Sequence, residues 1–169
     1  LDVEAAAAGD QQGEGIKFGS HLHSFLIMLT RDFYKPLDIV TAFYGISPDE
    51  YFDPNLSPAR IHQLANRMRA WLEESRLPAT LDNVQARYRF SSSDRLGIRI
   101  SSTPLPLGRQ RLLLHKLGRV FGAKEFSAKE ARDVLDMSFG PMNELIRWGL
   151  EQMKLTKIGT GAKTRYKLS

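Results

Sequence analysis

The sequence contains no cysteine, which excludes disulfide bonds and any metal site built from thiolates. No apolar run approaches the roughly 20 residues that a membrane-spanning helix needs, and no basic segment followed by an apolar stretch marks a secretory signal. Only four histidines are present, and although His21 and His23 have a spacing that can chelate a metal, no third ligand accompanies them. We therefore expect no metal or other cofactor, no membrane partner, and a cytoplasmic or nucleoid-associated location.

Motifs typical of enzymes are missing as well. The glycine-rich pattern GxGxxG and the phosphate-loop pattern GxxxxGK followed by Ser or Thr are both absent. The acids Glu73 and Glu74 are adjacent and point in different directions on a helix, so they do not form a catalytic pair. Residues 159–164, GTGAKT, superficially resemble a phosphate loop, but they are expected between two strands, as the tip of a hairpin. We therefore expect a protein that is not an enzyme.

Charge is distributed unevenly along a chain whose composition is otherwise that of a globular protein. Of the 169 residues, 42% are hydrophobic, which is enough to build packed cores. Residues up to Thr103 include 11 Lys and Arg against 13 Asp and Glu, whereas residues from Pro104 onward include 13 against 6. No acidic residue follows Glu151. A basic C-terminal part joined to a slightly acidic N-terminal part is typical of a nucleic-acid module attached to another module.

Two segments of small and polar residues divide the chain. Residues 101–108, SSTPLPLG, contain two prolines, which disfavour a preceding helix and lack a donor for a strand ladder. Residues 1–15 are acidic, rich in Ala and Gly and aperiodic, so we expect a flexible N-terminal linker there. Because the chain opens on Leu1 and not on methionine, we expect a fragment or a processed product. The two modules then cover residues 16–100 and 109–169.

The C-terminal module has signals for three helices followed by a hairpin. Ser127 and Glu130 form a Ser-x-x-Glu capping box, which fixes the start of a helix. Gly140 and Pro141 mark the start of the next one. The expected helices cover residues 109–122, 126–137 and 140–155, and the expected strands cover residues 155–159 and 164–169. Three helices and a cationic hairpin are suited to lying on a phosphate backbone, and this order predicts a winged helix.

The N-terminal module shows the same order of elements. Pro36 is placed to be the first residue of a helix that Gly45 would end, and Ser57 with Pro58 resembles an N-cap followed by a first-turn proline. Alternating residues on either side of the turn at Asp94 predict a hairpin. The expected helices cover residues 21–33, 36–45 and 58–75, and the expected strands cover residues 80–91 and 96–101. The sequence therefore predicts an α+β protein of two tandem winged helices.

Residues 58–91 carry a more specific pattern. An Arg-apolar-Arg core on a helix precedes an acidic pair, a proline, a strand and an aromatic strand; these features stand as Arg67-Met68-Arg69, Glu73-Glu74, Pro78, Leu81 to Val84 and Tyr88-Arg89-Phe90. The segment resembles the winged-helix effector domain of response regulators of the OmpR/PhoB type. The resemblance implies that the helix starting at Pro58 is the recognition helix and that the hairpin from Leu81 is the wing. The C-terminal module resembles winged helices only in general.

Residue types suited to DNA are present in both modules. Asn143 can pair with adenine and Arg147 with guanine in the major groove, although Arg147 has Glu144 and Glu151 one turn away as alternative partners. In the first module, Glu73 and Asp53 are alternative partners for the arginines of the long helix. The candidate DNA-binding residues are Arg60, Gln63, Asn66, Arg67, Arg69, Arg87, Arg89, Ser138, Asn143, Arg147, Lys157, Lys163, Arg165 and Lys167.

These observations predict a non-catalytic fragment of a larger transcriptional or replication protein that binds double-stranded DNA. The alternative is a winged-helix scaffold in a chromosome- or polymerase-associated complex, with a protein partner on the first module. That alternative rests on the acidic charge of the module and on an apolar cluster expected to be exposed, namely Phe43, Tyr44, Tyr51 and Phe52. An RNA-binding winged helix is the third alternative, because charge alone does not distinguish RNA from DNA.

Overall fold

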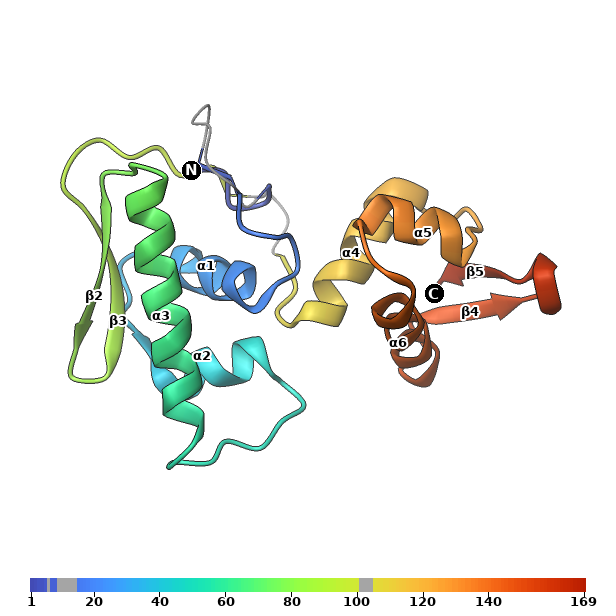
Figure 1. Cartoon of the computed structure of the whole chain (residues 1–169), viewed down its shortest axis with the longest axis horizontal. Coiled ribbons are helices and arrows are strands. Elements are labelled where there is room, and N and C mark those ends of the chain that lie inside the picture. Colours follow the sequence, from blue (N-terminus) through green and yellow to red (C-terminus); the bar gives the residue numbers. More distant parts are fainter. Residues whose placement is uncertain (6, 9–14, 101–104) are drawn as a thin grey trace. The chain divides into compact units, whose positions relative to one another are not determined.

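The chain folds into two compact units of mixed α and β structure, residues Leu1–Arg109 and Gln110–Ser169 (Figure 1). The computed structural model describes residues 1–5, 7–8, 15–100 and 105–169. Much of the linker expected at residues 1–15, and half of the one expected at 101–108, lies outside these described residues. Each unit is built from helices and a small antiparallel sheet, so the predicted α+β class is confirmed.

The first unit contains three helices and a three-stranded sheet. Its elements are α1 (His21–Arg31), β1 (Leu37–Asp38), α2 (Ile39–Ile46), α3 (Ser57–Glu74), β2 (Ala79–Val84) and β3 (Arg87–Ser92). Helix α3 runs alongside the hairpin of β2 and β3 in Figure 1, and the two are packed together. The apolar side chains of the helices and of the inner sheet face form one core, with Phe25, Phe43, Ile61, Met68 and Tyr88 almost fully buried.

The hairpin of this unit differs from the one expected around Asp94. Strand β3 lies between β1 and β2, and Leu81 pairs with Phe90 across β2 and β3. The turn consists of Gln85 and Ala86, both with positive φ. The prediction of a second hairpin strand at residues 96–101 is wrong, because the backbone of Arg99 forms its hydrogen bonds with the N-terminal segment instead. The hairpin from Leu81 that the response-regulator resemblance implied is present in its place.

The second helix starts later than Pro36, where we expected it. Leu37 pairs with Tyr88 of β3, so the backbone is still extended there. The carboxylate of Asp38 then caps α2 by accepting the backbone N–H of Thr41 at 2.8 Å. The expectation that Gly45 ends the helix is also wrong. Gly45 lies inside α2, where the close packing of α1 leaves no room for a side chain. A Cβ at this position would lie 2.1 Å from the sulfur of Met28.

Helix α3 begins one residue before the predicted start. Leu56 takes the N-cap position and makes no side-chain cap hydrogen bond, and Pro58 lies in the first turn. The hydroxyl of Ser57 therefore does not cap the helix. It accepts the backbone N–H of Asp53 at 2.9 Å and so closes the loop that precedes α3.

The described residues of the N-terminal segment are packed against the first unit, in contrast to the linker that we expected. Val3 is 2% exposed, and its carbonyl accepts a hydrogen bond from Nε2 of His23 at 2.8 Å. The backbone N–H of Gly19 donates to Nδ1 of the same ring at 3.0 Å. Both ring nitrogens of the buried His23 are therefore occupied, which makes this residue a structural histidine and not a metal ligand.

The second unit matches the predicted order of three helices and a hairpin. Its elements are α4 (Arg109–Phe121), α5 (Ala128–Leu135), α6 (Phe139–Glu151), β4 (Leu155–Ile158), the short 3-10 helix η1 (Gly161–Lys163) and β5 (Arg165–Leu168). The predicted capping box is confirmed, since Ser127 and Glu130 exchange both hydrogen bonds at the start of α5. Helix α6 starts at Phe139, one residue before the predicted Gly140.

The sheets of the two units are completed in the same way. In the first unit Leu37, just before the second helix, pairs with Tyr88 of the last strand. In the second unit Phe126, just before α5, forms an isolated bridge with Tyr166 of the last strand, with backbone hydrogen bonds of 2.8 and 2.9 Å. Both units therefore have the order helix, extended segment, helix, helix, strand, strand, with the last strand in the middle.

The third helix also ends in the same way in both units. Arg76 and Met153 follow these helices in the left-handed region, with φ of 51° and 52°. The backbone N–H of the following residue donates to the carbonyl of Leu72 at 3.2 Å in the first unit. In the second unit it donates to the carbonyl of Gly149 at 2.8 Å. This is a Schellman arrangement formed without glycine at the left-handed position. In both units the same backbone geometry thus ends the third helix and directs the chain into the hairpin that follows.

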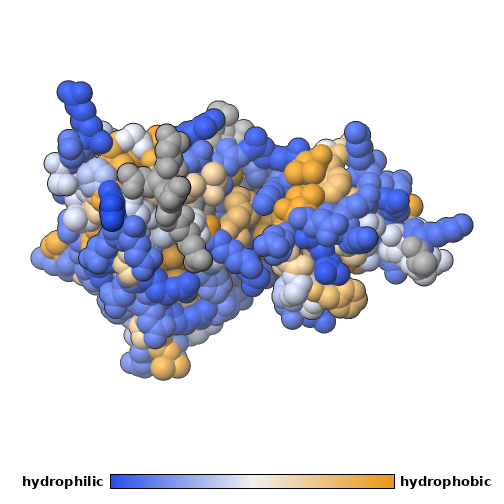
Figure 2. All heavy atoms as spheres, turned by 45° about the horizontal axis from the view of Figure 1, so that its top comes forward, coloured by the Kyte–Doolittle hydropathy of each residue, from blue (hydrophilic) through white to orange (hydrophobic). Residues whose placement is uncertain are grey.

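The surface carries no large apolar face in the view of Figure 2, where hydrophilic side chains cover most of the molecule and apolar ones lie in small separate patches. The most exposed large apolar side chains are those of Tyr34, Tyr51, Leu56, Val84, Phe139 and Met153. Among the described residues, no helix combines the length and apolar character needed to cross a bilayer.

Candidate nucleic-acid interface

Helix α6 presents the polar residues that we predicted for base contact. Met142, Leu145 and Ile146 are buried on one side of the helix, whereas Asn143 and Arg147 are exposed and lie one turn apart. Glu144 and Glu151 flank Arg147, but neither forms an ion pair with it in the described part of the chain. The guanidinium of Arg147 is therefore available for a partner outside the unit.

The turn before α6 is held by its own contacts. Asp136 ends α5 in the left-handed region with φ of 49°, and Nε of Arg132 donates to the carbonyl of Met137 at 3.3 Å. Ser138 then occupies the N-cap position of α6, where its exposed side chain makes no cap hydrogen bond. The Ser138 hydroxyl is thus free at the start of the helix, the place from which recognition helices contact bases.

The hairpin of the second unit separates its cations by face. Thr156 pairs with Lys167 and Ile158 with Arg165, so both cations lie on the same face of the two strands. Lys157 pairs with Tyr166 and lies on the opposite face. All three side chains are exposed, as is that of Lys163 at the tip. The segment 159–164 lies between β4 and β5, so its prediction as a hairpin tip is confirmed.

Arg165 differs from the other cations because it has a partner within the unit. Its Nη1 lies 3.0 Å from Oε2 of Glu130. The same carboxylate oxygen accepts the backbone N–H and the hydroxyl of Ser127, both at 2.7 Å. The hydrogen bond from the Ser127 backbone, and to a smaller extent the one from its hydroxyl, hold the pKa of Glu130 below its ordinary value. The charge of Arg165 lowers this pKa further. Arg165 thus connects the hairpin to the start of α5.

In the first unit, two of the predicted residues are tied to the sheet. Nε of Arg69 donates to the carbonyl of Leu81 at 2.8 Å, and its Nη1 donates to the side-chain oxygen of Asn66 at 2.8 Å. Arg69 is half-buried. The alternative pairing of Arg69 with Glu73 or Asp53 is therefore wrong. Arg69 thus fastens α3 to β2, and Asn66, although exposed, is engaged by the guanidinium of Arg69.

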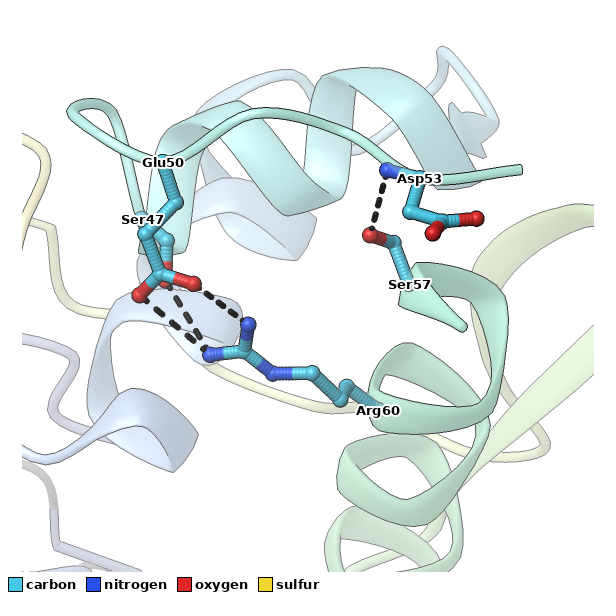
Figure 3. A network of polar contacts seen from close by, with 5 residues as sticks. All are labelled: Ser47, Glu50, Asp53, Ser57 and Arg60. Atoms are coloured by element: carbon cyan, nitrogen blue, oxygen red, sulfur yellow. Dashed lines mark hydrogen bonds and ion pairs between the residues drawn. The ribbon is translucent and has the colours of Figure 1, made fainter. Parts of the chain in front are cut away.

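Arg60 is also held in place, by the loop between α2 and α3. Its guanidinium forms an ion pair with Glu50 at 2.5 Å and lies 3.5 Å from the hydroxyl of Ser47 (Figure 3). The guanidinium carbon is 5.4 Å from the centre of the Phe43 ring. Hydrogen bonding from Arg60 holds the pKa of Glu50 below its ordinary value. Glu50 was not among the sequence predictions, since nothing in the local pattern links it to a residue ten positions away.

The two arginines of β3 lie on the outer face of the sheet, close to acidic residues. Arg89 pairs in register with Asp82 of β2, and Arg87 pairs with Asp38 of β1 and Val84 of β2. Both arginines are exposed. The nearby carboxylates lower the positive potential of this face, because opposite charges within a few ångströms offset each other.

Gln63 and Arg67 remain exposed on α3, and the structure brings them together with Arg60 along one side of the helix. Arg67 has no ion pair within the described part of the chain, so the alternative pairing with Glu73 or Asp53 is wrong for this residue too. Of the five candidates on α3, only Gln63 and Arg67 are therefore both exposed and unengaged.

No group of three or more metal-ligating side chains is found among the described residues. Comparison with protein-family models and with curated proteins gives no match for the chain. Its function therefore has to be inferred from its own residues.

Proposed function

We propose that the chain is a non-catalytic nucleic-acid-binding fragment of a larger transcriptional or replication protein, and that it binds double-stranded DNA through its second unit. The observation that carries the proposal is the combination of α6, which exposes Asn143 and Arg147, with a hairpin that exposes lysines and contains no acidic residue. Amide and guanidinium groups read base edges, and lysines neutralise phosphates.

The order of elements supports the assignment of both units as winged helices. In each unit an extended segment before the second helix pairs with the last strand, and a hairpin follows the third helix. In this assignment α6 is the recognition helix, which enters the major groove with its N-terminal half. The hairpin of β4 and β5 is the wing, which lies on the adjacent phosphates.

The residues of the second unit then have distinct roles. Asn143 pairs with adenine and Arg147 with guanine, each pair contributing about 1–3 kcal/mol of discrimination against the wrong base. The Ser138 hydroxyl contacts a base edge or a phosphate at the start of the helix. Lys157, Lys163 and Lys167 contact phosphates, whereas Arg165 mainly holds the wing against α5. No metal or cofactor takes part, and the location that suits this function is the cytoplasm or the nucleoid.

DNA binding by the first unit is supported less strongly than DNA binding by the second unit. Arg60 and Arg69 are engaged within the unit, and the wing arginines Arg87 and Arg89 lie beside carboxylates. Arg67 is the best remaining candidate for a phosphate contact from this unit. We therefore assign the main electrostatic contribution to the second unit.

A protein partner on the first unit is the second candidate function. The exposed side chains of Tyr51 and Tyr44, 85% and 44% accessible, favour it, because large exposed aromatic groups are enriched in interfaces. The cluster predicted to be exposed is only partly so. Phe43 is 2% exposed and belongs to the core. Phe52 packs against it, with the centres of the two rings 5.3 Å apart.

Fluorescence anisotropy with a labelled duplex of about two helical turns tests the proposal. The affinity of the chain should fall steeply between about 50 and 200 mM salt, because each phosphate contact contributes about 0.9 to the slope of log K against log salt. Replacing Lys157, Lys163 and Lys167 by alanine should lower that slope by about 2 to 3. A competing RNA duplex tests the alternative nucleic acid.

The matched control replaces three exposed cations of the first unit, Lys17, Lys35 and Arg95, by alanine. This variant loses the same net charge but should keep the slope almost unchanged. Equal losses in both triple variants would show that overall charge and not the wing determines binding. An affinity independent of salt would contradict the phosphate contacts altogether.

A further inference from the structure

A pocket of about 160 Å³ lies within the first unit, between the start of α1, the end of α2 and one side of α3. Its lining residues are His21, Phe43, Ile46, Ser47, Arg60, Ile61, Gln63, Leu64 and Arg67. It takes no part in the proposed contacts of the second unit with DNA. Of its lining residues, Arg67 is also the best candidate of the first unit for a phosphate contact.

The walls of this pocket combine an apolar floor with a cationic rim. Phe43, Ile46 and Ile61 belong to the core of the unit and also line the pocket. Arg60 and Arg67 lie at the rim about two turns apart on α3, and no acidic side chain is among the lining residues. Small-molecule sites combine apolar side chains with a few convergent polar groups, and the lining of this pocket contains both kinds.

The two arginines of the rim differ in what they contact. Arg60 is fixed by the Glu50 carboxylate and the Ser47 hydroxyl, so its charge is already balanced (Figure 3). Arg67 has no such carboxylate in the described part of the chain. Its guanidinium offers a planar pair of donors, which matches the two oxygens of a carboxylate. The amide of Gln63, one turn before it, supplies a further donor.

The volume limits the size of the ligand. An engineered cavity of about 150 Å³ in another protein holds one benzene molecule, so the pocket here has room for a single ring or a short branched chain. We propose that this pocket binds a small organic carboxylate with a compact apolar body, whose carboxylate pairs with Arg67 and Gln63 and whose body lies on Phe43, Ile46 and Ile61.

His21 reports on the charge in this pocket. Partial burial is the main cause that lowers the pKa of its imidazole, and the charges of Arg60, Arg109 and Arg67 act in the same direction, whereas Glu50 opposes them. A bound carboxylate adds a negative charge beside the ring. Because a negative charge favours the protonated imidazole, binding should raise the pKa of His21.

Titration of the ¹⁵N-labelled chain with sodium benzoate, followed by NMR, tests the proposal. Saturable shifts are expected at Gln63 and Arg67, together with a higher pKa of His21 in the bound state. Benzamide, which is neutral and of almost the same shape, should bind at least about tenfold more weakly, because it lacks the charge that pairs with arginine. Inorganic phosphate should also bind at least about tenfold more weakly than benzoate, because it has no apolar body.

Arg67→Ala should weaken benzoate binding by at least about tenfold, and Arg89→Ala should leave it unchanged. Both side chains are exposed, so neither change should disturb the core, and the amide spectrum of each variant verifies the fold. The proposal would be overturned if benzoate gave no saturable shifts, if Arg67→Ala bound it as well as the parent chain, or if benzamide or phosphate bound equally tightly. A His21 pKa that stays the same at saturation would also contradict the assigned position of the carboxylate.

Discussion

Arg165 and Glu130 are 35 positions apart in the sequence, yet Nη1 of the arginine lies 3.0 Å from the carboxylate oxygen that completes the capping box of α5. This contact ties the last strand of the chain to the start of the second helix of its unit. Arg165 therefore has a structural partner, whereas Lys163, two positions earlier at the tip of the wing, is exposed and has none among the described residues.

The first prediction separates the roles of these two cations. Lys163→Ala should weaken DNA binding and lower the salt slope by about 0.9 without changing the melting temperature, because it removes one phosphate contact and no contact within the unit. Arg165→Ala should lower the melting temperature as well, since it removes the partner of Glu130. Anisotropy and thermal unfolding of both variants check this. If Arg165→Ala changed only DNA binding, the contact with Glu130 would have no structural role.

The second prediction concerns the two serines that precede helices of the second unit. Ser127→Ala should lower the free energy of unfolding by about 1 kcal/mol, because the Ser127 hydroxyl caps α5. Ser138→Ala is the matched control. Its side chain makes no cap hydrogen bond, so the change should stay within about 0.5 kcal/mol. Urea denaturation measures both, and a larger loss for Ser138→Ala would mean that its hydroxyl is not free.

The third prediction concerns the turn between β2 and β3. Gln85 and Ala86 have φ of 52° and 59°, as in the type I′ turns that favour Asn followed by Gly. Replacing Ala86 by glycine should raise the free energy of unfolding by about 1 kcal/mol, because a left-handed conformation costs alanine about that much. Gly159→Ala should do the opposite, since Gly159 has φ of 74°. Thermal unfolding that shifts in the same direction for both variants would refute this explanation.

The fourth prediction is the pH dependence of stability. Burial lowers the pKa of His23 below its ordinary value of 6.5, and the hydrogen bond with Val3 only partly opposes this effect. The folded state therefore prefers the neutral ring. Below about pH 6.5 the unfolded chain binds protons more readily than the folded one, so stability should be highest above this pH and should decrease as the pH falls.

Urea denaturation at about pH 7.5 and about pH 5.5 measures this loss, and NMR titration should give His23 a pKa below 6.5. His21, whose pKa is also lowered, contributes to the loss in the same direction. His23→Gln retains an acceptor and a donor but cannot be protonated, so it should lose less stability on acidification. An equal loss in this variant would exclude His23 as a source of the effect.

Where signals are local, the sequence predicted the structure well. The capping box of Ser127 and Glu130 lies within one turn of helix, and glycines at 159 and 161 mark the tip of the hairpin in the second unit. Such signals depend only on neighbouring residues, so α5, β4 and β5 lie close to their expected positions. The exposed face of α6 followed in the same way from the spacing of its apolar residues.

Where partners are distant, prediction failed. Leu37 is extended because it pairs with Tyr88, more than 50 positions away, and no local pattern reports this. Ala86 adopts a conformation that usually indicates glycine, so the turn in the first unit was misplaced to Asp94. The partners of Arg60 and Arg69 depend on tertiary packing in the same way. A list of candidate DNA-binding residues drawn from the sequence therefore includes arginines with structural roles. Only the fold distinguishes them from arginines that are available for a partner.

The left-handed residues Arg76 and Met153 have a practical consequence for engineering. Each sets the direction in which its hairpin leaves the preceding helix, and neither belongs to the tip of that hairpin. A wing tip can therefore be exchanged without altering the joint that aims it. Grafting residues 159–164 in place of Gln85 and Ala86 would give the first unit a cationic tip, and the transplanted tip would isolate how much affinity charge alone confers.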